Sequence, residues 1–448
     1  MSTTLIPQGA KDIIKKLQDN NHEAYLVGGC VRDMLLGIPP NDWDICTDAR
    51  PEEVLELFKG TNRVIPTGLQ HGTVTVLSDE VPYEVTTYRV DGEYEDHRRP
   101  ATVSYTSNLI EDLARRDFTV NAMAYSPTVG LIDPYGGRED LNLRLLRCVG
   151  RPEDRFNEDS LRILRALRFA AVKGFRLEAG TEQAIYNLYS LMETLSAERV
   201  LSEILQLLVG DSAYTVLMKY AEIITYILPE LKPMYGCEQN NPHHKYDVYE
   251  HTCAVVSGLP KNEVLRVAAL FHDAGKPSTK TTEDGIDHFY GHPEVSIQLV
   301  EATLKRLKAS NALIEGVSPL IKYHDAELPN RRSVRRMVNK IGKEKTYELL
   351  YLKEADALAQ TLEYLPDKLL AVHNARKVLS ELEAEDACFG LKDLAVSGAD
   401  LLNSGFVQGK QVGETLKHLL NQVLDEVLSN DRDTLLKEAL KFKDRKAI

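Results

Sequence analysis

The spacing of hydrophobic residues over the first 90 positions predicts a mixture of helices and strands. Ala10, Ile13, Ile14 and Leu17 recur at helical spacing with Lys and Asp between them, which predicts an amphipathic helix. Shorter runs further on alternate and are rich in β-branched residues, as half-buried strands are. The pattern predicts helices over 8–20, 30–36 and 51–58 and strands over 24–27, 42–46, 64–65, 72–77 and 83–89, the last two paired as a hairpin.

After residue 142 apolar residues recur at every third or fourth position, so helices are expected to dominate. One helix is predicted over 154–171, and helices continue over 181–209. The stretch 131–141 carries Asp-Pro and Gly-Gly pairs, which are turn signals and mark the first domain boundary. The fold class is therefore an α+β head followed by all-α domains, which we divide into 1–141, 142–225, 226–365 and 366–448.

Composition narrows the class of protein. The 448 residues exceed the roughly 250–300 at which one hydrophobic core stops growing, so several domains are expected. The formal net charge of −13 argues against non-specific coating of nucleic acid, although local basic patches remain open. Six cysteines without a Cys-x-x-Cys pair indicate reduced thiols in a cytoplasmic protein. Neither a signal peptide nor a membrane-spanning run is recognisable, so no membrane association is expected.

The stretch 24–47 carries the first candidate chemistry. Gly28 and Gly29 form a turn between a predicted strand and a predicted helix, where backbone N–H groups can meet an anion such as phosphate. Asp42 and Asp44 are two residues apart on a predicted strand, so both carboxylates point to one face. Paired carboxylates beside a phosphate cradle are hard oxygen ligands that suit Mg²⁺.

Each of these features alone is commonplace, since a Gly-Gly pair is usually only a turn and Asp-x-Asp is usually a solvated loop. No Gly-Lys-Ser/Thr follows, which excludes a Walker A loop, and the third glycine of a dinucleotide fingerprint is missing. The combination GGCVRD followed by DWD resembles the head of the polymerase-β-type nucleotidyltransferases of the class II tRNA CCA-adding and poly(A) polymerase family.

The resemblance implies a polymerase-β-like head, a helical neck, a body and a tail. It assigns Mg²⁺ to Asp42 and Asp44, and it raises Glu84 from an ordinary strand residue in a cross-strand pair to an equal candidate for a third catalytic carboxylate. It places a nucleotide near Gly28, Gly29 and Arg32. The run Arg115-Arg116-Asp117-Phe118, with Asn121, matches the second head motif, in which the arginines lie near the triphosphate and the aspartate contacts the ribose.

The third motif, Glu158-Asp159-x-x-Arg162, matches the base-reading motif of the family. The simpler interpretation is an ion pair between Asp159 and Arg162, three residues apart on one helix. By resemblance, Asp159 accepts from the exocyclic amine of cytosine or adenine while Arg162 donates to ring acceptors, and Glu158 either takes part or holds Arg162 in place. The nucleotide-binding residues expected from this helix are Glu158, Asp159, Arg162, Arg165 and Arg168, and Glu198-Arg199 with Glu203 resemble a bracing neck motif.

The middle of the chain carries histidines in a second pattern. His251, His272-Asp273 and Asp356 resemble the HD class of metal-dependent phosphohydrolase domains, in which they would hold a divalent transition metal. His292 and His324 are candidates for a second metal position. The alternative is a helical scaffold with a silent site. A basic run at 331–340 is a candidate for contact with the RNA backbone.

The function expected from the resemblance is untemplated addition of C, C and A to the 3′ end of tRNA from CTP and ATP, with no DNA partner. A charged loop over 90–107 resembles the flexible loop of CCA-adding enzymes and favours the full reaction. Its Arg98 and Arg99 are within reach of a triphosphate on this interpretation, but we expect them to be solvated when no nucleotide is bound. Alternatives that stay open are an A-adding or CC-adding enzyme, a poly(A) polymerase, an HD phosphohydrolase with an RNA-binding head, and a non-catalytic RNA-binding protein.

Overall fold

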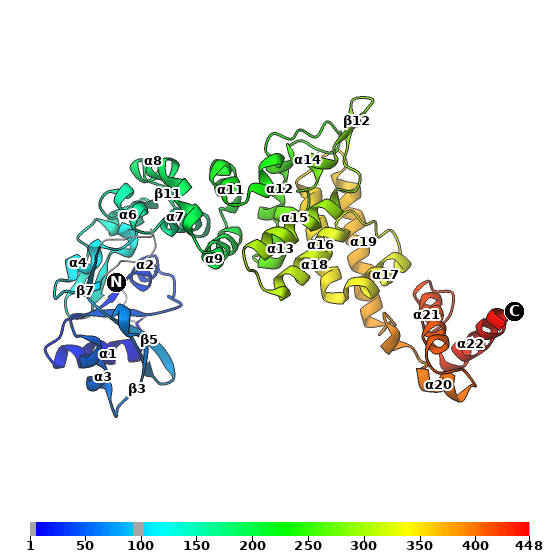
Figure 1. Ribbon diagram of the computed structural model, residues 1–448, viewed down its shortest axis with the longest axis horizontal. Coiled ribbons are helices and arrows are strands. Elements are labelled where there is room, and N and C mark those ends of the chain that lie inside the picture. Colours follow the sequence, from blue (N-terminus) through cyan, green and yellow to red (C-terminus); the bar gives the residue numbers. More distant parts are fainter. Residues whose placement is uncertain (1–5, 93–102, 448) are drawn as a thin grey trace. The chain divides into compact units, whose positions relative to one another are not determined.

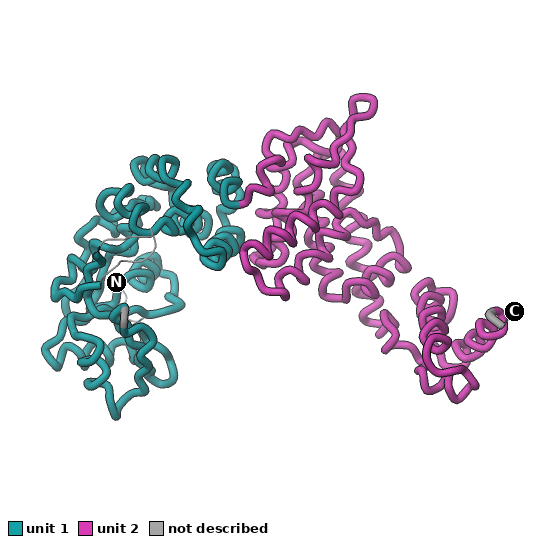
Figure 2. Tube along the Cα trace, in the orientation of Figure 1, with its two compact units in different colours: residues 1–227 teal, residues 228–448 magenta. Residues whose placement is uncertain are grey.

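The computed structural model describes residues 6–92 and 103–447. It divides the chain into two compact units, Met1–Ile227 and Leu228–Ile448, shown in different colours in Figure 2. Arg98 and Arg99 of the predicted flexible loop lie outside the described residues. The division into four domains is finer than this split and stays a prediction.

The first unit is built on a seven-stranded sheet with the order β3-β4-β5-β2-β1-β8-β9 (Figure 1). Its neighbouring strands run antiparallel except β2 and β5, which are parallel. Helix α1 packs against β1 and β2, and α3 against β3, β4 and β5. The strands are β1 Ala24–Val27, β2 Asp44–Thr47, β3 Arg63–Gly68, β4 Thr73–Ser78, β5 Val81–Thr87, β8 Ala124–Ser126 and β9 Gly130–Ile132, and the small pairs are β6 Arg89–Asp91 with β7 Val103–Tyr105 and β10 Leu145–Leu146 with β11 Arg176–Leu177.

Helices pack against the sheet, and the chain that follows it is largely helical, as the hydrophobic pattern predicted. The α+β head followed by a largely helical remainder is therefore confirmed. The α-helices of the first unit are α1 Gln8–Asp19, α2 Gly29–Leu35, α3 Pro51–Phe58, α4 Leu109–Ala114, α5 Gly137–Asn142, α6 Pro152–Glu158, α7 Leu161–Lys173, α8 Ala179–Leu188, α9 Ala197–Leu208, α10 Ala213–Lys219 and α11 Ala221–Ile227.

Two predicted elements differ from the structure near the candidate site. The strand predicted over 42–46 begins at Asp44, so Asp42 lies in the loop before it. The helix predicted over 154–171 is broken into α6 and α7 at Asp159, whose backbone is extended. The Asp159 carboxylate accepts a hydrogen bond from the N–H of Leu161 at 3.1 Å. Such local bonding lets aspartate end one helix and start another, which the apolar periodicity does not reveal.

The second unit is helical apart from the hairpin β12 Thr281–Glu283 with β13 Ile286–His288, which projects from the helical body (Figure 1). A separate apolar cluster, including Leu401, Leu419 and Leu435, forms the core of the tail. The α-helices are α12 Val248–Gly258, α13 Glu263–Phe271, α14 Lys276–Thr279, α15 His292–Arg306, α16 Asn311–Tyr323, α17 Arg331–Ile341, α18 Lys343–Leu358, α19 Leu365–Ala384, α20 Gly398–Asn403, α21 Lys410–Leu424 and α22 Arg432–Ala447.

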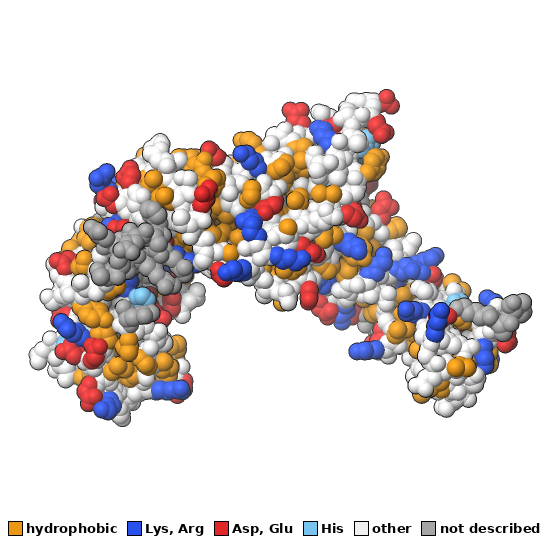
Figure 3. Space-filling view, in the orientation of Figure 1, with side chains coloured by type: hydrophobic (Ala, Val, Ile, Leu, Met, Phe, Trp, Pro, Cys, Tyr) orange, Lys and Arg blue, Asp and Glu red, His pale blue; other side chains and the backbone are white. Residues whose placement is uncertain are grey.

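The basic run on α17 binds the tail of its own chain. Arg336 pairs with Asp425, just after α21, at 2.6 Å, and Arg331 pairs with Glu426 at 2.6 Å. Arg332 joins Asp425 at 2.7 Å. These guanidinium groups thus have carboxylate partners within the chain, and contact of the run with RNA stays a prediction. On the face drawn in Figure 3, basic and acidic side chains are interspersed. Among the described helices, none combines the length and apolar character needed to cross a bilayer.

The close packing of α7 against the chain after α9 makes a testable prediction. A Cβ added to Gly210 would lie 2.5 Å from the backbone carbonyl carbon of Ala171. We expect Gly210→Ala to destabilise the first unit by about 1–3 kcal/mol, since backbone must move. Gly413 on α21 has open space around it, so Gly413→Ala should stabilise its helix by about 0.5–1 kcal/mol. Urea unfolding followed by circular dichroism measures both, and a Gly210→Ala protein as stable as the parent would contradict the packing.

Candidate active site and metal centre

Three carboxylates gather where β2 and β5 run in parallel. Asp44 and Glu84 occupy the same register position on these neighbouring strands, so their side chains share one face of the sheet. Burial, followed by the charges of Asp42 and Glu84, raises the pKa of Asp44 to about 6. Glu84 therefore faces Asp44 rather than a cationic cross-strand partner. Crowded carboxylates that hinder one another's ionisation fit a divalent cation, which offsets their repulsion.

The Gly28-Gly29 turn approaches a fixed positive charge. Gly28 has φ +77°, and a Cβ at this position would meet Nη1 of Arg116 at 2.9 Å. The positive charge of Arg116 favours the ionised form of Asp44, although burial and the two acidic neighbours outweigh it and keep the pKa of Asp44 raised. Arg116 therefore acts on both the glycine turn and the carboxylates. The turn thus combines a left-handed backbone with a close arginine, for which glycine is the suitable residue.

The two arginines of the second head motif are held by an acidic residue that sequence reasoning missed. Asp112 on α4 is fully buried, and its Oδ1 accepts from Nη2 of Arg115 at 2.7 Å while Oδ2 accepts from Nη2 of Arg116 at 3.3 Å. Burial favours the neutral acid, but Arg116 and Arg115 hold the pKa of Asp112 below its ordinary value. The sequence did contain a signal for this contact, because Asp112 precedes Arg115 by three residues and Arg116 by four, a spacing at which side chains on a helix meet.

A continuous hydrogen-bonded network joins four of the predicted nucleotide-binding residues. Nη1 of Arg32 donates to Oδ1 of Asn121 at 2.6 Å, and Nδ2 of Asn121 donates to Oδ1 of Asp117 at 3.0 Å. The other oxygen of Asp117 accepts from Arg165 at 2.6 Å. Burial opposes ionisation of Asp117, but Arg165 and Asn121 outweigh it and lower the pKa to about 2. Asp117 is therefore an ionised acceptor in a fixed position.

The residues predicted to read the base each have a partner inside the protein. Arg162 donates to Oε2 of Glu158 at 2.6 Å and to the backbone carbonyl of Arg115 at 2.9 Å. Asp159 accepts from Nη2 of Arg199, on α9, at 2.8 Å. Glu158 thus holds Arg162, and Asp159 is engaged by Arg199, which the sequence had assigned to bracing alone. Because the helix breaks between α6 and α7, Asp159 has an extended backbone whereas Arg162 lies on helix α7.

Arg168 differs from its neighbours on α7. Its Nε donates to Glu203 on α9 at 2.5 Å, and its guanidinium lies over the ring of Phe169 at 4.5 Å. The structure thus places Arg168 in a brace between two helices and outside the Asp117 network, in contrast to Arg165. A second ion pair between helices, which the sequence analysis missed, joins Lys173 to Asp33 at 3.0 Å. Asp33 also pairs with Nε of Arg32 at 2.9 Å.

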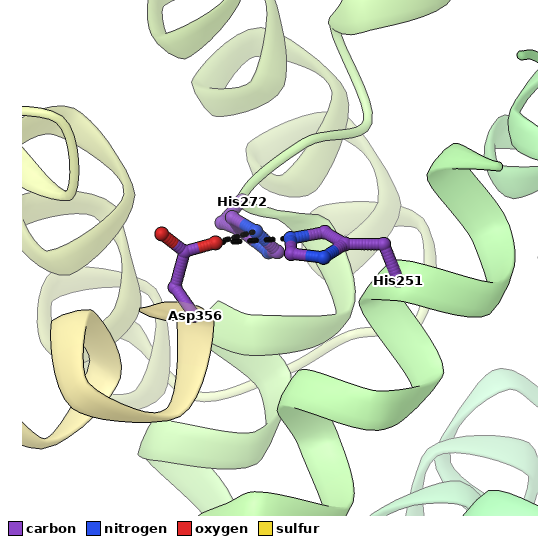
Figure 4. Close-up of side chains that lie close together, drawn as sticks. All are labelled: His251, His272 and Asp356. Atoms are coloured by element: carbon purple, nitrogen blue, oxygen red, sulfur yellow. Dashed lines mark hydrogen bonds and ion pairs between the residues drawn. The ribbon is translucent and has the colours of Figure 1, made fainter. Parts of the chain in front are cut away.

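In the second unit, ligand atoms from separate helices converge. His251 on α12, His272 after α13 and Asp356 on α18 point toward one another in Figure 4, and their ligand atoms lie within 4.8 Å. Nε2 of His251 is 2.9 Å from Oδ1 of Asp356. Gln360 donates to the other oxygen of Asp356 at 3.0 Å and so orients this carboxylate. Hydrogen bonds of this kind orient carboxylates that ligate metals.

Asp273 links this cluster to a second one. One of its oxygens, Oδ2, lies 3.3 Å from Nε2 of His272, whereas Oδ1 lies 3.3 Å from Nε2 of His292. His324 completes the second cluster, with its Nε2 3.7 Å from the same Oδ1. The six residues predicted as HD ligands are thus brought together as two groups of three, and Asp273 lies between them in the position of a bridging carboxylate.

The hydrogen bonds of the histidines show that both groups fit a cation. Nδ1 of His272, His292 and His324 each bonds a backbone carbonyl three residues earlier, at 2.7–2.8 Å, so this nitrogen carries the proton. The Nε2 atoms of His292 and His324 then face each other at 3.1 Å, which neutral rings tolerate only with a cation or a proton between their lone pairs. Burial lowers the pKa of His272, yet Asp273 and Asp356 raise it to about 10 overall, which reflects the same demand for positive charge.

Comparison with known protein families supports the division into head and later parts. Residues 24–147 match a family model described as Poly A polymerase head domain. Residues 174–235 match one described as "Probable RNA and SrmB- binding site of polymerase A", and residues 286–439 match one described as "tRNA nucleotidyltransferase domain 2 putative".

Curated relatives and solved structures extend over nearly the whole chain. A CCA-adding enzyme of Enterococcus faecalis is 32% identical over 458 aligned positions, covering 99% of each chain, and one of Lactiplantibacillus plantarum is 34% identical over 98% of this chain and 97% of its own. The crystal structure of the Bacillus stearothermophilus CCA-adding enzyme in complex with CTP has a TM-score of 0.72 at 28% identity, covering 100% of this chain and 99% of its own. A Thermotoga maritima CCA-adding enzyme complexed with tRNA, at 20% identity and a TM-score of 0.60, shares the fold. The chain belongs to the family of CCA-adding enzymes.

Proposed function

We propose that this protein is a tRNA nucleotidyltransferase that adds C, C and A to the 3′ end of tRNA from CTP and ATP and releases pyrophosphate. Full-length similarity to CCA-adding enzymes supports the assignment. The observation in this chain that carries it is the carboxylate cluster of Asp42, Asp44 and Glu84 beside the buried arginines. Free thiols at all six cysteines agree with a cytoplasmic location, where tRNA and nucleotides are found.

The carboxylate cluster would hold Mg²⁺ on Asp42 and Asp44, with Glu84 beside them. When bound, such ions lower the pKa of the tRNA 3′-hydroxyl and offset the charge of the triphosphate. The protein itself supplies position: Arg115 and Arg116 are fixed by Asp112 before a triphosphate arrives. Cations held in place need little reorganisation during reaction, which favours the charge that develops on departing pyrophosphate. Ionised Asp117 is ready to accept from a ribose hydroxyl.

Selection of the base follows from the donor and acceptor pattern of Asp159 and Arg162. An aspartate accepts from the exocyclic amine of cytosine or adenine, whereas uracil and guanine present a carbonyl at that position. Binding the wrong base would leave two acceptors facing each other, and an unsatisfied buried polar group is costly. The two side chains would exchange Arg199 and Glu158 for the base as it enters.

The assignment to full CCA addition is tested on tRNA transcripts that end before the tail, at C, or at CC. Each receives CTP, ATP, both, UTP or GTP with Mg²⁺, and products are resolved on a sequencing gel. We expect three nucleotides on the tailless tRNA and none beyond. Arrest after CC, extension of the CC-ended transcript alone, or a long adenosine tail would instead assign one of the partial or poly(A) activities.

Replacing one metal-binding carboxylate should remove nucleotide addition. Asp42→Asn keeps the shape of the side chain but removes its charge, so we expect kcat to fall by roughly 10³-fold, equivalent to the several kcal/mol that charge stabilisation supplies. Asp19→Asn, at the exposed end of α1, is the control and should leave kcat within twofold. Equal activity of the Asp42→Asn protein would place the metal elsewhere.

The base-reading role predicts a change in selectivity at Asp159. In Asp159→Ala, the ratio of kcat/KM for CTP over UTP should fall by roughly 5- to 100-fold, since one paired base contact contributes about 1–3 kcal/mol. Asp154→Ala, at an exposed residue on the preceding helix α6, controls for loss of a negative charge nearby in the chain. A proportional drop with CTP and UTP, with the ratio unchanged, would mean that Asp159 serves structure alone.

For the histidine–aspartate cluster we propose a second function, hydrolysis of a phosphate ester. The facing Nε2 atoms of His292 and His324, with Asp273 between the two groups, support it. His251, His272, Asp273 and Asp356 would hold one divalent transition metal, and Asp273, His292 and His324 a second. When bound, such metals lower the pKa of water and neutralise phosphate charge. The test substrate is an RNA end carrying a 2′,3′-cyclic phosphate.

The two functions should separate by mutation. Asp42→Ala should lose nucleotide addition and retain phosphate-ester hydrolysis with Mn²⁺ or Ni²⁺, while Asp273→Asn should do the reverse. The metal content of chelated and reloaded protein, measured by mass spectrometry, should be near two per chain and fall in Asp273→Asn. A cluster that takes up no metal, or an Asp42→Ala protein that loses both activities, would rule out an independent hydrolase.

A further inference from the structure

The cavity that contains the histidine–aspartate cluster is much larger than a phosphate group requires. Its volume is about 840 Å³, within the range of about 300–1,000 Å³ typical of small-molecule sites. One part of its lining is apolar, with Phe289, Leu328, Leu350 and Val372. The cavity therefore has space and apolar surface for a group attached to the phosphate, and the ligand clusters alone do not explain it.

The same cavity carries cationic groups that suit a phosphate beside its acidic residues. Lys276, Lys353 and Lys368 all line it. Lys276 lies 2.8 Å from Oδ2 of Asp273, and Nζ of Lys353 donates to the backbone carbonyl of His324 at 2.5 Å, so both ammonium groups are fixed next to ligand residues. An anionic group bound at the cluster would lie among these charges, and the rest of the molecule would extend toward the wider part of the cavity.

A tyrosine on the cavity wall presents an aromatic face to solvent. The Tyr290 side chain is 73% exposed although it lines the cavity. Its ring stacks on His288 with a centroid distance of 5.4 Å and an interplanar angle of 4°. Gly291, with φ +77°, turns the chain directly from Tyr290 to the ligand His292. The aromatic pair is thus attached, through one glycine, to the metal-binding cluster.

The segment that carries this aromatic pair is anchored. Asp287, at the end of the β12–β13 hairpin, is buried and accepts from the N–H of Asn240 at 2.8 Å and from Thr282 at 2.7 Å. Lys280 pairs with the same carboxylate at 2.8 Å. A large aromatic surface held in place, rather than packed into a core, is suited to stacking against a planar ligand, because little side-chain entropy is lost on binding.

We propose that Tyr290, backed by His288, is a stacking site for a nucleobase in the histidine–aspartate cavity, so that the cavity takes a nucleotide with its phosphate toward the lysines and the ligand clusters. The proposal rests on the phosphate-ester function proposed above and specifies what the ester carries. Base-to-aromatic stacking tolerates any base, so the site selects nucleotides over other phosphate esters without reading sequence.

The test is a binding measurement on metal-stripped full-length protein by calorimetry, with adenosine 3′-monophosphate, ribose 5-phosphate and inorganic phosphate as probes. Tyr290→Ala should weaken binding of the adenosine nucleotide by roughly 5- to 100-fold, the effect of losing one stacked base, and leave the other two probes unchanged. Tyr290→Phe keeps the ring and should bind within twofold of the parent. Tyr235→Ala removes another exposed tyrosine of the same unit, outside the cavity lining, and is the matched control.

Equal nucleotide affinity in the parent and Tyr290→Ala, an equal loss for inorganic phosphate, or no nucleotide binding by the parent overturns the proposal. Because Tyr290 belongs to the unit Leu228–Ile448, a loss caused by its replacement is assigned to this cavity and not to the head. Hydrolysis is measured separately, as the release of inorganic phosphate from adenosine 3′-monophosphate in the presence of Mn²⁺. A protein that binds adenosine 3′-monophosphate through Tyr290 but releases no phosphate would sustain the stacking site and disprove the hydrolase.

Discussion

The parallel pairing of β2 with β5 is the constraint on which the head depends. Antiparallel neighbours make up the rest of the sheet, and this single parallel pair places Asp44 next to Glu84 at one register position. Burial, then repulsion from Asp42 and Glu84, raises the pKa of Asp44. A shift of one residue in this register would move one carboxylate to the opposite face and remove the cluster. On its other side β5 is joined to β4 by a tight hairpin, in which Asp79 and Glu80 both adopt the left-handed backbone that such turns need.

Around this cluster, the protein fixes its cations with buried acids. Asp112 holds Arg115 and Arg116, and Asp117 holds Arg165. A buried charge without a partner would cost several kcal/mol, so these carboxylates are required before any ligand arrives. In the second unit the imbalance of charge is the opposite one. There the acids and the histidine lone pairs converge without enough positive charge, and Lys276 supplies only part of it. The arginines of the head are prepared for an anion, whereas the histidine–aspartate cluster, like the carboxylates of the head, is prepared for cations.

The sequence was sufficient for the class of fold and the family, because both depend on local patterns. Gly28-Gly29, the Asp-x-Asp pair and the arginine motif each lie within a few residues, and the period of apolar positions distinguishes strand from helix. The partners of those residues were harder to predict. Arg199 lies 40 residues from Asp159, and Asp425 lies 89 residues from Arg336, so neither ion pair leaves a local signal. The pairing of the basic run on α17 with the tail of the chain was consequently not foreseen. The break at Asp159 was missed because apolar residues keep helical spacing across it.

The internal partners of Asp159 and Arg162 have a thermodynamic consequence for the base recognition that we propose. A base that displaces Arg199 and Glu158 gains hydrogen bonds that replace existing ones, so the net gain in affinity is small. A base with the wrong pattern of hydrogen-bond donors and acceptors would break the same internal bonds without replacing them. Discrimination can therefore be large while binding stays weak, and the nucleotide can leave the pocket readily once it has been joined to the RNA. An arrangement of this kind suits an enzyme that must bind two different nucleotides in succession at one place.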